Sequence, residues 1–590
     1  RWLLRPAAAI VALLLVALGA FDFIGVDAIG NERLRFHAEQ AIEKLAGVDV
    51  DVSIGSINLG LGRTSLFALE VRDAGIVRAS DKAPVANIGG LRLGLRAIPL
   101  LSGRIELSRV VVADALLTPS EISSGTGPTL TELLARPSAI SPDELNRAVF
   151  DAIDRAFEIT RGAGLAHVSF SNVGFLAGGQ TVPDLLVENL EINRESGTKI
   201  DLNGVARYQG RELSFAGSAG RDPNTNVTSD LALKVSAAEG EEASPAEEGL
   251  VRSIGAFDLT LSGKAPAGAE RGFLRIEIAA DKILLDFGED ELALDGASVA
   301  IGAGTGEDVF SVLQARLDSG RTRVNFQGTF GPETATSGKP GYRMDLVSRD
   351  SVLAPTDSPE APLPFAVRLA GRFDPAAMRL VADPIEVRSA EGELRASAAI
   401  TVAEGKSPGI KLSLQVSSMP TAHVKQFWPW FAAPGARNWT LQNVFGGTIR
   451  DSGMTLEVPP GRLGNGIPLG SKEVSGRFAL SDTRFNIAGE IPAVRDADGY
   501  VEFHGTDVKV GLSSGRAYME SGRTVDAIDG TLMIDASKEH RRIGNLEIDV
   551  AGEAPAILEF VSYRPIAASR FHDFKPEDLT GKMSGHVSAE

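Results

Sequence analysis

The chain has 590 residues, of which 43% are hydrophobic and 23% charged, with a formal net charge of -18 and no cysteine. This apolar fraction excludes wholesale disorder, the lack of cysteine excludes disulfides and thiolate metal sites, and the negative charge disfavours binding to nucleic acid phosphates. Length alone suggests about three or four domains, but the 64 glycines favour a chain that turns often.

Residues 1–25 have the pattern of a transmembrane anchor. The stretch 6–21 has no charged residue, and with its flanks it approaches the roughly 20 residues that a spanning helix needs. Two arginines precede the stretch and acidic residues follow it, so the positive-inside rule places the N-terminus in the cytoplasm and the bulk of the chain outside it. A cleaved signal peptide is the alternative, because Ala17 and Gly19 form a small-x-small site.

Two amphipathic helices are expected, over residues 26–47 and 141–160. In the first, apolar residues recur at helical spacing and Gly47 offers a C-cap. The second has Ser141 as its N-cap and Glu144 as the acid of a capping box, followed by a stripe of apolar residues. Such a stripe favours core packing, with a membrane or partner role as the alternative.

Most of the remaining chain has the pattern of β-strands. Six stretches alternate apolar and polar residues with period two and are separated by turn signals. They are residues 48–59, 257–263, 274–278, 323–328, 410–416 and 545–550. Each has one apolar face, and the opposite face carries side chains such as Arg323, Lys411 and Glu547. We expect no helices after Phe157 that could cover so much sheet, so the apolar face must pack on another sheet, close on itself or line a groove that something else fills.

The β-rich part of the chain divides into three regions, residues 48–140, 161–425 and 448–590. The middle region contains two breaks in the strand pattern, near 236–249 and 350–364. The first break is acidic and the second is rich in proline, which is typical of solvated loops, with binding tails as the alternative. The sequence stops within what looks like a new strand, so we expect the native protein to continue.

A tryptophan-rich helical insertion over residues 426–447 interrupts the strands. It holds three of the four tryptophans, and its proline and glycines can open and end a short helix. The aromatic residues concerned are Phe427, Trp428, Trp430, Phe431 and Trp439. Because tryptophan is mostly buried, a plug packed on one section of sheet is the first interpretation. A lid or constriction, with Arg437 and Asn438 anchoring its backbone, is the second.

No catalytic constellation is recognisable in the sequence. The stretch "GLSSG" (511–515) matches the G-x-S-x-G motif, but that motif needs a strand-to-helix turn and strands are expected on both sides here. The seven histidines are scattered without metal-ligand spacing. We therefore expect neither enzymatic activity nor a cofactor or metal site.

Two parts of the sequence resemble a known family. Residues 65–120 combine a strand pair, a Leu-alternating strand and a "PLLSGRI" turn, and they resemble the N-terminal module of the AsmA-like envelope proteins. The stretch "FWPWFAAPGARNWTLQNVFGGTI" (427–449), followed by residues 490–518, is similar to the larger YhdP-type branch of that superfamily, which includes lipid transfer proteins related to TamB. The resemblance implies an elongated, curved β-sheet with a hydrophobic groove, anchored in the inner membrane of a diderm bacterium. It also implies that phospholipids move along this groove through the periplasm towards the outer membrane, which supports envelope integrity.

We therefore expect a mainly β protein, with an N-terminal transmembrane helix, an elongated β-groove and a few short helices, whose apolar strand faces form a path for acyl chains. The groove candidates are Phe257, Leu259, Leu261, Leu274, Ile276, Ile278, Val324, Phe326, Leu412, Leu414, Val416, Leu546, Ile548 and Val550. The expected partners are phospholipids, the inner membrane and the outer membrane or its proteins, without nucleic acid. The alternative is an envelope scaffold or outer-membrane-protein assembly factor with a self-filled β core.

Overall fold

The structure is a computed structural model, and it describes residues 39, 50–60, 67–78, 82, 84–96, 107–117, 139–162, 165–176, 183, 185–208, 210–238, 251–265, 272–286, 291–334, 340–403, 406–486, 489–535, 543–570 and 573–589. The expected anchor over 1–25 lies outside these residues, as does the expected helix over 26–47 apart from Glu39. Among the helices of the described part, none combines the length and the apolar character that crossing a membrane requires.

The fold is mainly β, as the alternation predicts, with 28 strands in the described part of the chain. These residues divide into two compact units. Unit 1 takes those within 1–244, 254–281 and 298–313, and unit 2 takes those within 245–253, 282–297 and 314–590.

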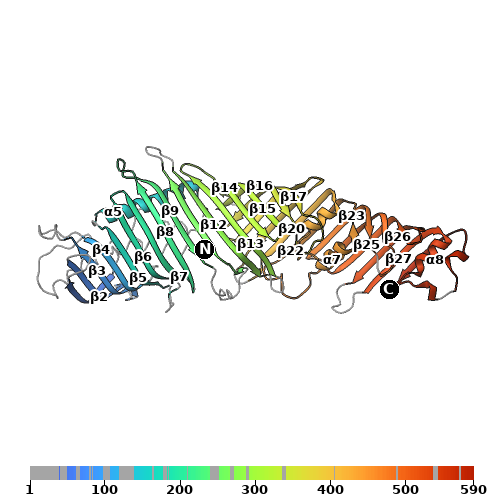
Figure 1. Ribbon diagram of the computed structural model, residues 1–590, viewed down its shortest axis with the longest axis horizontal. Coiled ribbons are helices and arrows are strands. Elements are labelled where there is room, and N and C mark those ends of the chain that lie inside the picture. Colours follow the sequence, from blue (N-terminus) through green and yellow to red (C-terminus); the bar gives the residue numbers. More distant parts are fainter. Residues whose placement is uncertain are drawn as a thin grey trace. The chain divides into compact units, whose positions relative to one another are not determined.

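The strands of unit 1 form a nearly continuous antiparallel meander. They are β1 (Val50–Gly60), β2 (Phe67–Arg78), β3 (Pro84–Leu95), β4 (Leu107–Leu117), β5 (His167–Phe175), β6 (Leu185–Ser196), β7 (Lys199–Tyr208), β8 (Arg211–Arg221), β9 (Thr228–Ala237), β11 (Phe257–Lys264) and most of β12 (Phe273–Asp286). Figure 1 shows β2 to β9 side by side, from blue to green. β11 pairs with both β9 and β12, so neighbours in the sheet are almost always neighbours along the chain.

The exception in unit 1 is the parallel pair β4–β5. Parallel strands need a crossover connection, and helix α5 (Pro142–Gly162) lies in it, where a helix over 141–160 was expected. The capping box is present: the Ser141 hydroxyl accepts a hydrogen bond from the Glu144 N–H, and the Glu144 carboxylate accepts one from the Ser141 N–H, both at 3.1 Å. The N-terminus of α5 is therefore fixed by its own sequence.

Like β12, the strands β13 (Glu291–Gly304) and β14 (Phe310–Ser319) have residues in both units, and the short β10 (Val251–Ser253) belongs to unit 2. The other strands of unit 2 are β15 (Thr322–Thr334), β16 (Pro340–Leu353), β17 (Leu363–Asp374), β18 (Arg379–Ser389), β19 (Gly392–Thr401), β20 (Gly409–Pro420), β21 (Val444–Phe445), β22 (Thr448–Val458), β23 (Val474–Phe485), β24 (Val494–His504), β25 (Asp507–Tyr518), β26 (Thr524–Asp535), β27 (Ile543–Glu553) and β28 (Lys582–Ala589). From β15 to β28 they too form an antiparallel meander in chain order, except that β20 pairs directly with β22 and β21 pairs with β23.

The described residues of unit 2 contain three α-helices, namely α6 (Thr421–Phe427), α7 (Pro434–Asn443) and α8 (Ala554–Ser562). The helical insertion expected over 426–447 thus begins five residues earlier, directly at the end of β20. One short helix late in the chain covers part of the sheet, within the few short helices expected: α8 packs against β26, β27 and β28 and buries Ile557 and Phe560. Its sequence "APAILEFVS" is almost continuously apolar, and such short runs carry no period that separates helix from strand.

Candidate functional site

The apolar face of unit 1 is assembled by strand register. Antiparallel pairing sets side chains from successive strands opposite one another, so they form rows that run across the strands. Two rows of aligned residues cross five strands from β7 to β12 and together form what we call the unit 1 band. One row holds Leu202, Gly217, Leu233, Leu261 and Ile276, and the other holds Gly204, Phe215, Val235, Leu259 and Ile278.

Every large side chain of the unit 1 band is only half-buried. The neighbouring row, in contrast, is buried, and it consists of Ile200, Ala219, Leu231, Gly263 and Leu274. Phe150 of α5 covers this row at Gly263, where an added Cβ would lie 3.1 Å from the Phe150 ring and 2.8 Å from Leu274 Cδ2. The unit 1 band is therefore the part of the apolar face that α5 leaves uncovered.

Polar contacts hold α5 at the strand ends. The buried Asn146 side chain donates to the carbonyl oxygens of Gly272 and Ala303, at 3.2 and 3.0 Å. About two turns farther along α5, Asp154 accepts hydrogen bonds from both the N–H and the hydroxyl of Thr228, at 2.8 and 2.6 Å. These contacts fix how much of the apolar face the helix covers.

The opposite face of the same strands is polar. Lys234 on β9 lies 3.3 Å from Asp258 on β11, and Arg275 pairs with Glu277 on β12. The hydrogen bond from the Ser236 hydroxyl, together with Lys234, lowers the pKa of Asp258, so this carboxylate is charged at neutral pH. Unit 1 thus has one hydrated face and one apolar face that is only partly covered.

Arg211 borders the unit 1 band at the end away from α5. Its guanidinium lies 5.7 Å from the centre of the Phe257 ring and donates to the carbonyl oxygens of Ile254 and Ala238. Burial lowers the pKa of Arg211. The apolar face therefore ends at a cation that the backbone holds in place.

In unit 2 the exposure of the apolar face decreases along the sheet. A row of aligned residues first crosses β15 to β19 through half-buried positions, which we call the unit 2 band: Gly328, Leu346, Leu369, Ile385 and Ala396. The same row continues through Leu414, Met454, Gly476, Phe503 and Val508 on β20 to β25. Among these, Leu414 is 7% exposed, Met454 3% and Phe503 0%. From β20 onwards, the side chains of this row are therefore buried beneath other parts of the chain.

Trp428 provides much of this cover. Its ring centre lies 5.0 Å from that of Phe503 and 5.2 Å from that of Phe478, and its indole N–H donates to the carbonyl of Ala432 at 2.7 Å. Beside it, Phe427 packs edge-on against Phe365 at 5.4 Å. Trp428 is buried, whereas Phe427, Trp430, Phe431 and Trp439 are half-buried.

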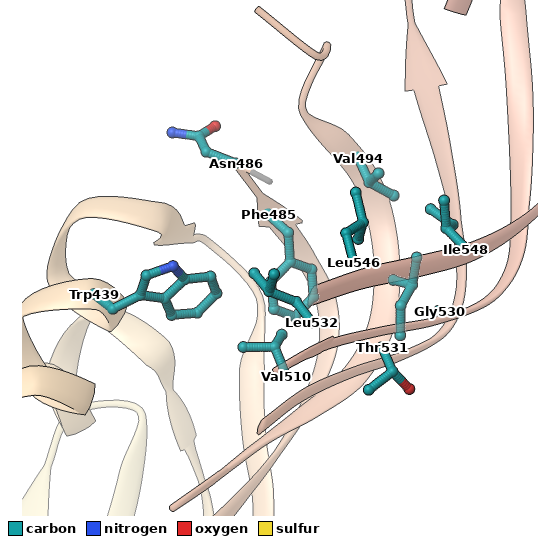
Figure 2. Close-up of a pocket in the computed structure, with 11 residues that line it drawn as sticks. Trp439, Phe485, Asn486, Val494, Val510, Gly530, Thr531, Leu532, Leu546 and Ile548 are labelled. Atoms are coloured by element: carbon teal, nitrogen blue, oxygen red, sulfur yellow. The ribbon is translucent and has the colours of Figure 1, made fainter. Parts of the chain in front are cut away.

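Trp439 borders a small apolar hollow. Figure 2 shows its indole facing Phe485, Val510 and Leu532, with Leu546 and Ile548 on the far side. The centre of a water molecule can reach about 30 Å³ of this hollow, which is room for about two waters. The hollow, as it stands in this structure, cannot take an acyl chain.

The structure separates the predicted groove residues into two groups. The half-buried group consists of Phe257, Leu259, Leu261, Ile276, Ile278, Val324, Phe326 and Leu412. The buried group consists of Leu274, Leu414, Val416, Leu546, Ile548 and Val550. Sequence reasoning missed Leu233 and Val235 of the unit 1 band, although the stretch "LALKV" (231–235) alternates in the same way.

The stretch "GLSSG" (511–515) lies within β25, and its Leu512 lines the hollow beside Trp439. Ser513 of "GLSSG" is an exposed residue inside β25, with strand on both sides. Within the described residues, no group of three or more His, Cys, Asp or Glu side chains could hold a metal ion.

Comparisons of the chain with protein-family models, with curated proteins and with solved structures found no match. The two partly covered apolar faces are therefore the features from which a function has to be argued.

Proposed function

We propose that the protein carries the acyl chains of phospholipids along the apolar faces of its strands. The observation that carries this proposal is the unit 1 band, in which half-buried apolar side chains are aligned across five strands. At about 4.8 Å between strands, the rows extend for about 19 Å. Each lipid methylene that such a row keeps out of water contributes about 0.8 kcal/mol.

The sequence supplies the setting of the proposal. Residues 1–25 have the pattern of a membrane anchor with the bulk of the chain outside the cytoplasm. The resemblance to AsmA-like proteins implies that this is the inner membrane and that phospholipids move through the periplasm towards the outer membrane. A sheet with one hydrated and one partly uncovered apolar face is suited to this task, because the headgroup can remain in water while the acyl chain contacts the band.

The test is a pair of charge substitutions on one strand. Leu261 lies in the centre of the unit 1 band and is half-buried, so the carboxylate of Leu261→Asp can reach water and the fold should survive. Thr260→Asp adds the same charge on the opposite face and is the control. Copurified phospholipid per chain, measured by mass spectrometry of an organic extract, should fall in Leu261→Asp and stay unchanged in Thr260→Asp, with similar melting temperatures. Equal lipid loads in the two folded variants would contradict the proposal.

A second candidate is a structural envelope scaffold or assembly factor with a self-filled β core. The observation that favours it is the burial of the apolar face on β22 to β27, where Phe503, Ile548 and Val550 are at most 2% exposed. A self-filled protein should carry no stoichiometric phospholipid. Extraction of the wild-type protein therefore decides between the candidates.

A further inference from the structure

The row that contains the unit 2 band runs on beneath the chain's own aromatic insertion. The register connects Ala396 to Leu414, Met454, Gly476 and Phe503 without a break. The side chains are apolar on both sides of the point where exposure falls. Only the cover changes, because Trp428 lies on Phe478 and Phe503.

The insertion is not needed to hold the sheet together at this point. β20 pairs with β22 along its whole length, and Pro420 lies directly opposite Thr448 in the ladder. The segment Thr421–Asn443, which we call the plug, therefore lies in the long connection between the paired strands β20 and β22 and folds back over the apolar face. It can leave that face without breaking a pair between β20 and β22.

The plug is held by ion pairs as well as by aromatic packing. The buried Lys425 ammonium donates to Glu360 at 2.9 Å. The buried Arg437 guanidinium pairs with both carboxylate oxygens of Asp357 and donates to the carbonyl of Trp428 at 3.0 Å. Both carboxylates come from the loop between β16 and β17, and we call the two pairs the latch.

The buried surface of the plug is unusually polar. Of the 13 buried polar or charged residues of the described chain, five belong to it: Thr421, Lys425, Gln426, Arg437 and Thr440. The Thr421 hydroxyl and the side-chain amide oxygen of Gln426 are buried without a hydrogen-bond partner among the described residues. Such atoms oppose burial and regain hydrogen bonds on contact with water, so they favour release of the plug.

We propose that the plug is displaceable and that Trp428 occupies a second acyl-chain binding surface, formed by Leu414, Met454, Phe478 and Phe503. This inference rests on the proposed function. When the latch opens and Trp428 leaves, the row of the unit 2 band continues uncovered as far as Val508. An acyl chain then replaces the indole on Phe478 and Phe503.

The first part of the test measures release of the plug without lipid. The chain has no cysteine, so Thr440→Cys, at a position 5% exposed on α7, provides a single thiol of nearly unchanged size. Maleimide labelling of this thiol in the full chain should speed up on the order of tenfold or more when Asp357→Asn is added, because the lost hydrogen bonds to a charged group are strong ones. Asp345→Asn removes the carboxylate of an exposed ion pair with Arg368 on the neighbouring strands and is the control.

The second part of the test measures access of lipid to the covered surface. A photo-crosslinking residue replaces Met454 in one protein and Leu261 in another, and both are irradiated with vesicles of phosphatidylethanolamine and phosphatidylglycerol. Crosslinking at position 261 should be independent of the latch. Crosslinking at position 454 should be weak in the otherwise wild-type chain and rise severalfold with Asp357→Asn and with Glu360→Gln. Two latch variants are used because one of them could raise crosslinking simply by unfolding the protein. Far-UV circular dichroism would reveal such unfolding.

Three outcomes would overturn the inference. Unchanged labelling of Thr440→Cys when Asp357→Asn is added means that the ion pair between Arg437 and Asp357 does not hold the plug. Equal crosslinking at position 454 with and without the latch, while position 261 reacts, means that the plug does not control access, although the proposed function stands. If labelling of Thr440→Cys becomes faster but lipid crosslinks at neither position 261 nor position 454, the proposed function and the second binding surface are both refuted.

Discussion

Residues of the same type on strands of the same pattern have different surroundings in this protein. Ile278 on β12 is half-buried within the unit 1 band, whereas Ile548 on β27 is 2% exposed. Both directly follow a glutamate, Glu277 and Glu547. A charge introduced at the first position can reach water, and one introduced at the second cannot.

Ile548→Asp should therefore destabilise unit 2 by several kcal/mol, because an unpaired carboxylate would be buried among apolar side chains. Glu547→Leu, on the exposed face of the same strand, should change stability little. Urea unfolding of both variants measures the difference. A stable Ile548→Asp protein would mean that the face opens to water at β27.

A second prediction at this scale concerns the loop between β22 and β23. Arg462 binds both carboxylate oxygens of Glu473, at 2.6 and 2.7 Å, and these hydrogen bonds lower the pKa of Glu473 below its ordinary value. Because the folded-state pKa is below the unfolded one, the pair stabilises the fold above the unfolded pKa, and this stability is lost as the pH falls through the folded pKa.

Glu473→Gln should accordingly lower the melting temperature at neutral pH. The difference between the melting temperatures in neutral and in acidic solution should therefore be smaller for this variant than for the wild type. Melting curves at about pH 7 and about pH 3 for the two proteins provide the measurement. A variant that loses as much stability on acidification as the wild type would contradict this role of Glu473.

At the scale of elements, the plug is the part that the sheet can lose. Replacement of residues 421–447, which are the plug, the two-residue strand β21 and the two glycines after it, by a two-residue Asn-Gly turn should preserve most of the strand signal in circular dichroism, because Pro420 and Thr448 already lie opposite each other. The exposed surface around Phe478 and Phe503 should bind an environment-sensitive apolar dye, and the melting temperature should fall. Loss of the strand signal would show that the plug is a folding element of unit 2.

The strands were predictable from the sequence, and the cover over them was not. Alternation with period two depends only on neighbouring residues, so it located all six stretches, including 257–263 and 545–550. The burial of Lys425 and Arg437 depends on carboxylates 65 and 80 positions away in the chain. A sequence motif such as "GARNW" gives no signal of such partners, and cations in it would be expected in solvent.

At the scale of the whole molecule, the formal charge of -18 at pH 7 should affect the lipid source. A negative protein is repelled by an anionic bilayer, and salt screens this repulsion. Loading of phospholipid from phosphatidylglycerol vesicles should be slower than from phosphatidylcholine vesicles at about 0.05 M salt, and the difference should shrink at about 0.5 M. Equal rates at low salt would mean that the charge lies away from the loading point.

The meander connectivity of each unit has a consequence for how the chain acquires its structure. Almost every strand pairs with the one synthesised just before it, so contacts are local in sequence and loop-closure entropy stays small at each step. Each unit can thus grow strand by strand during translation. Gain or loss of one hairpin in evolution would lengthen or shorten an apolar row by about 10 Å and leave the register of the other strands unchanged.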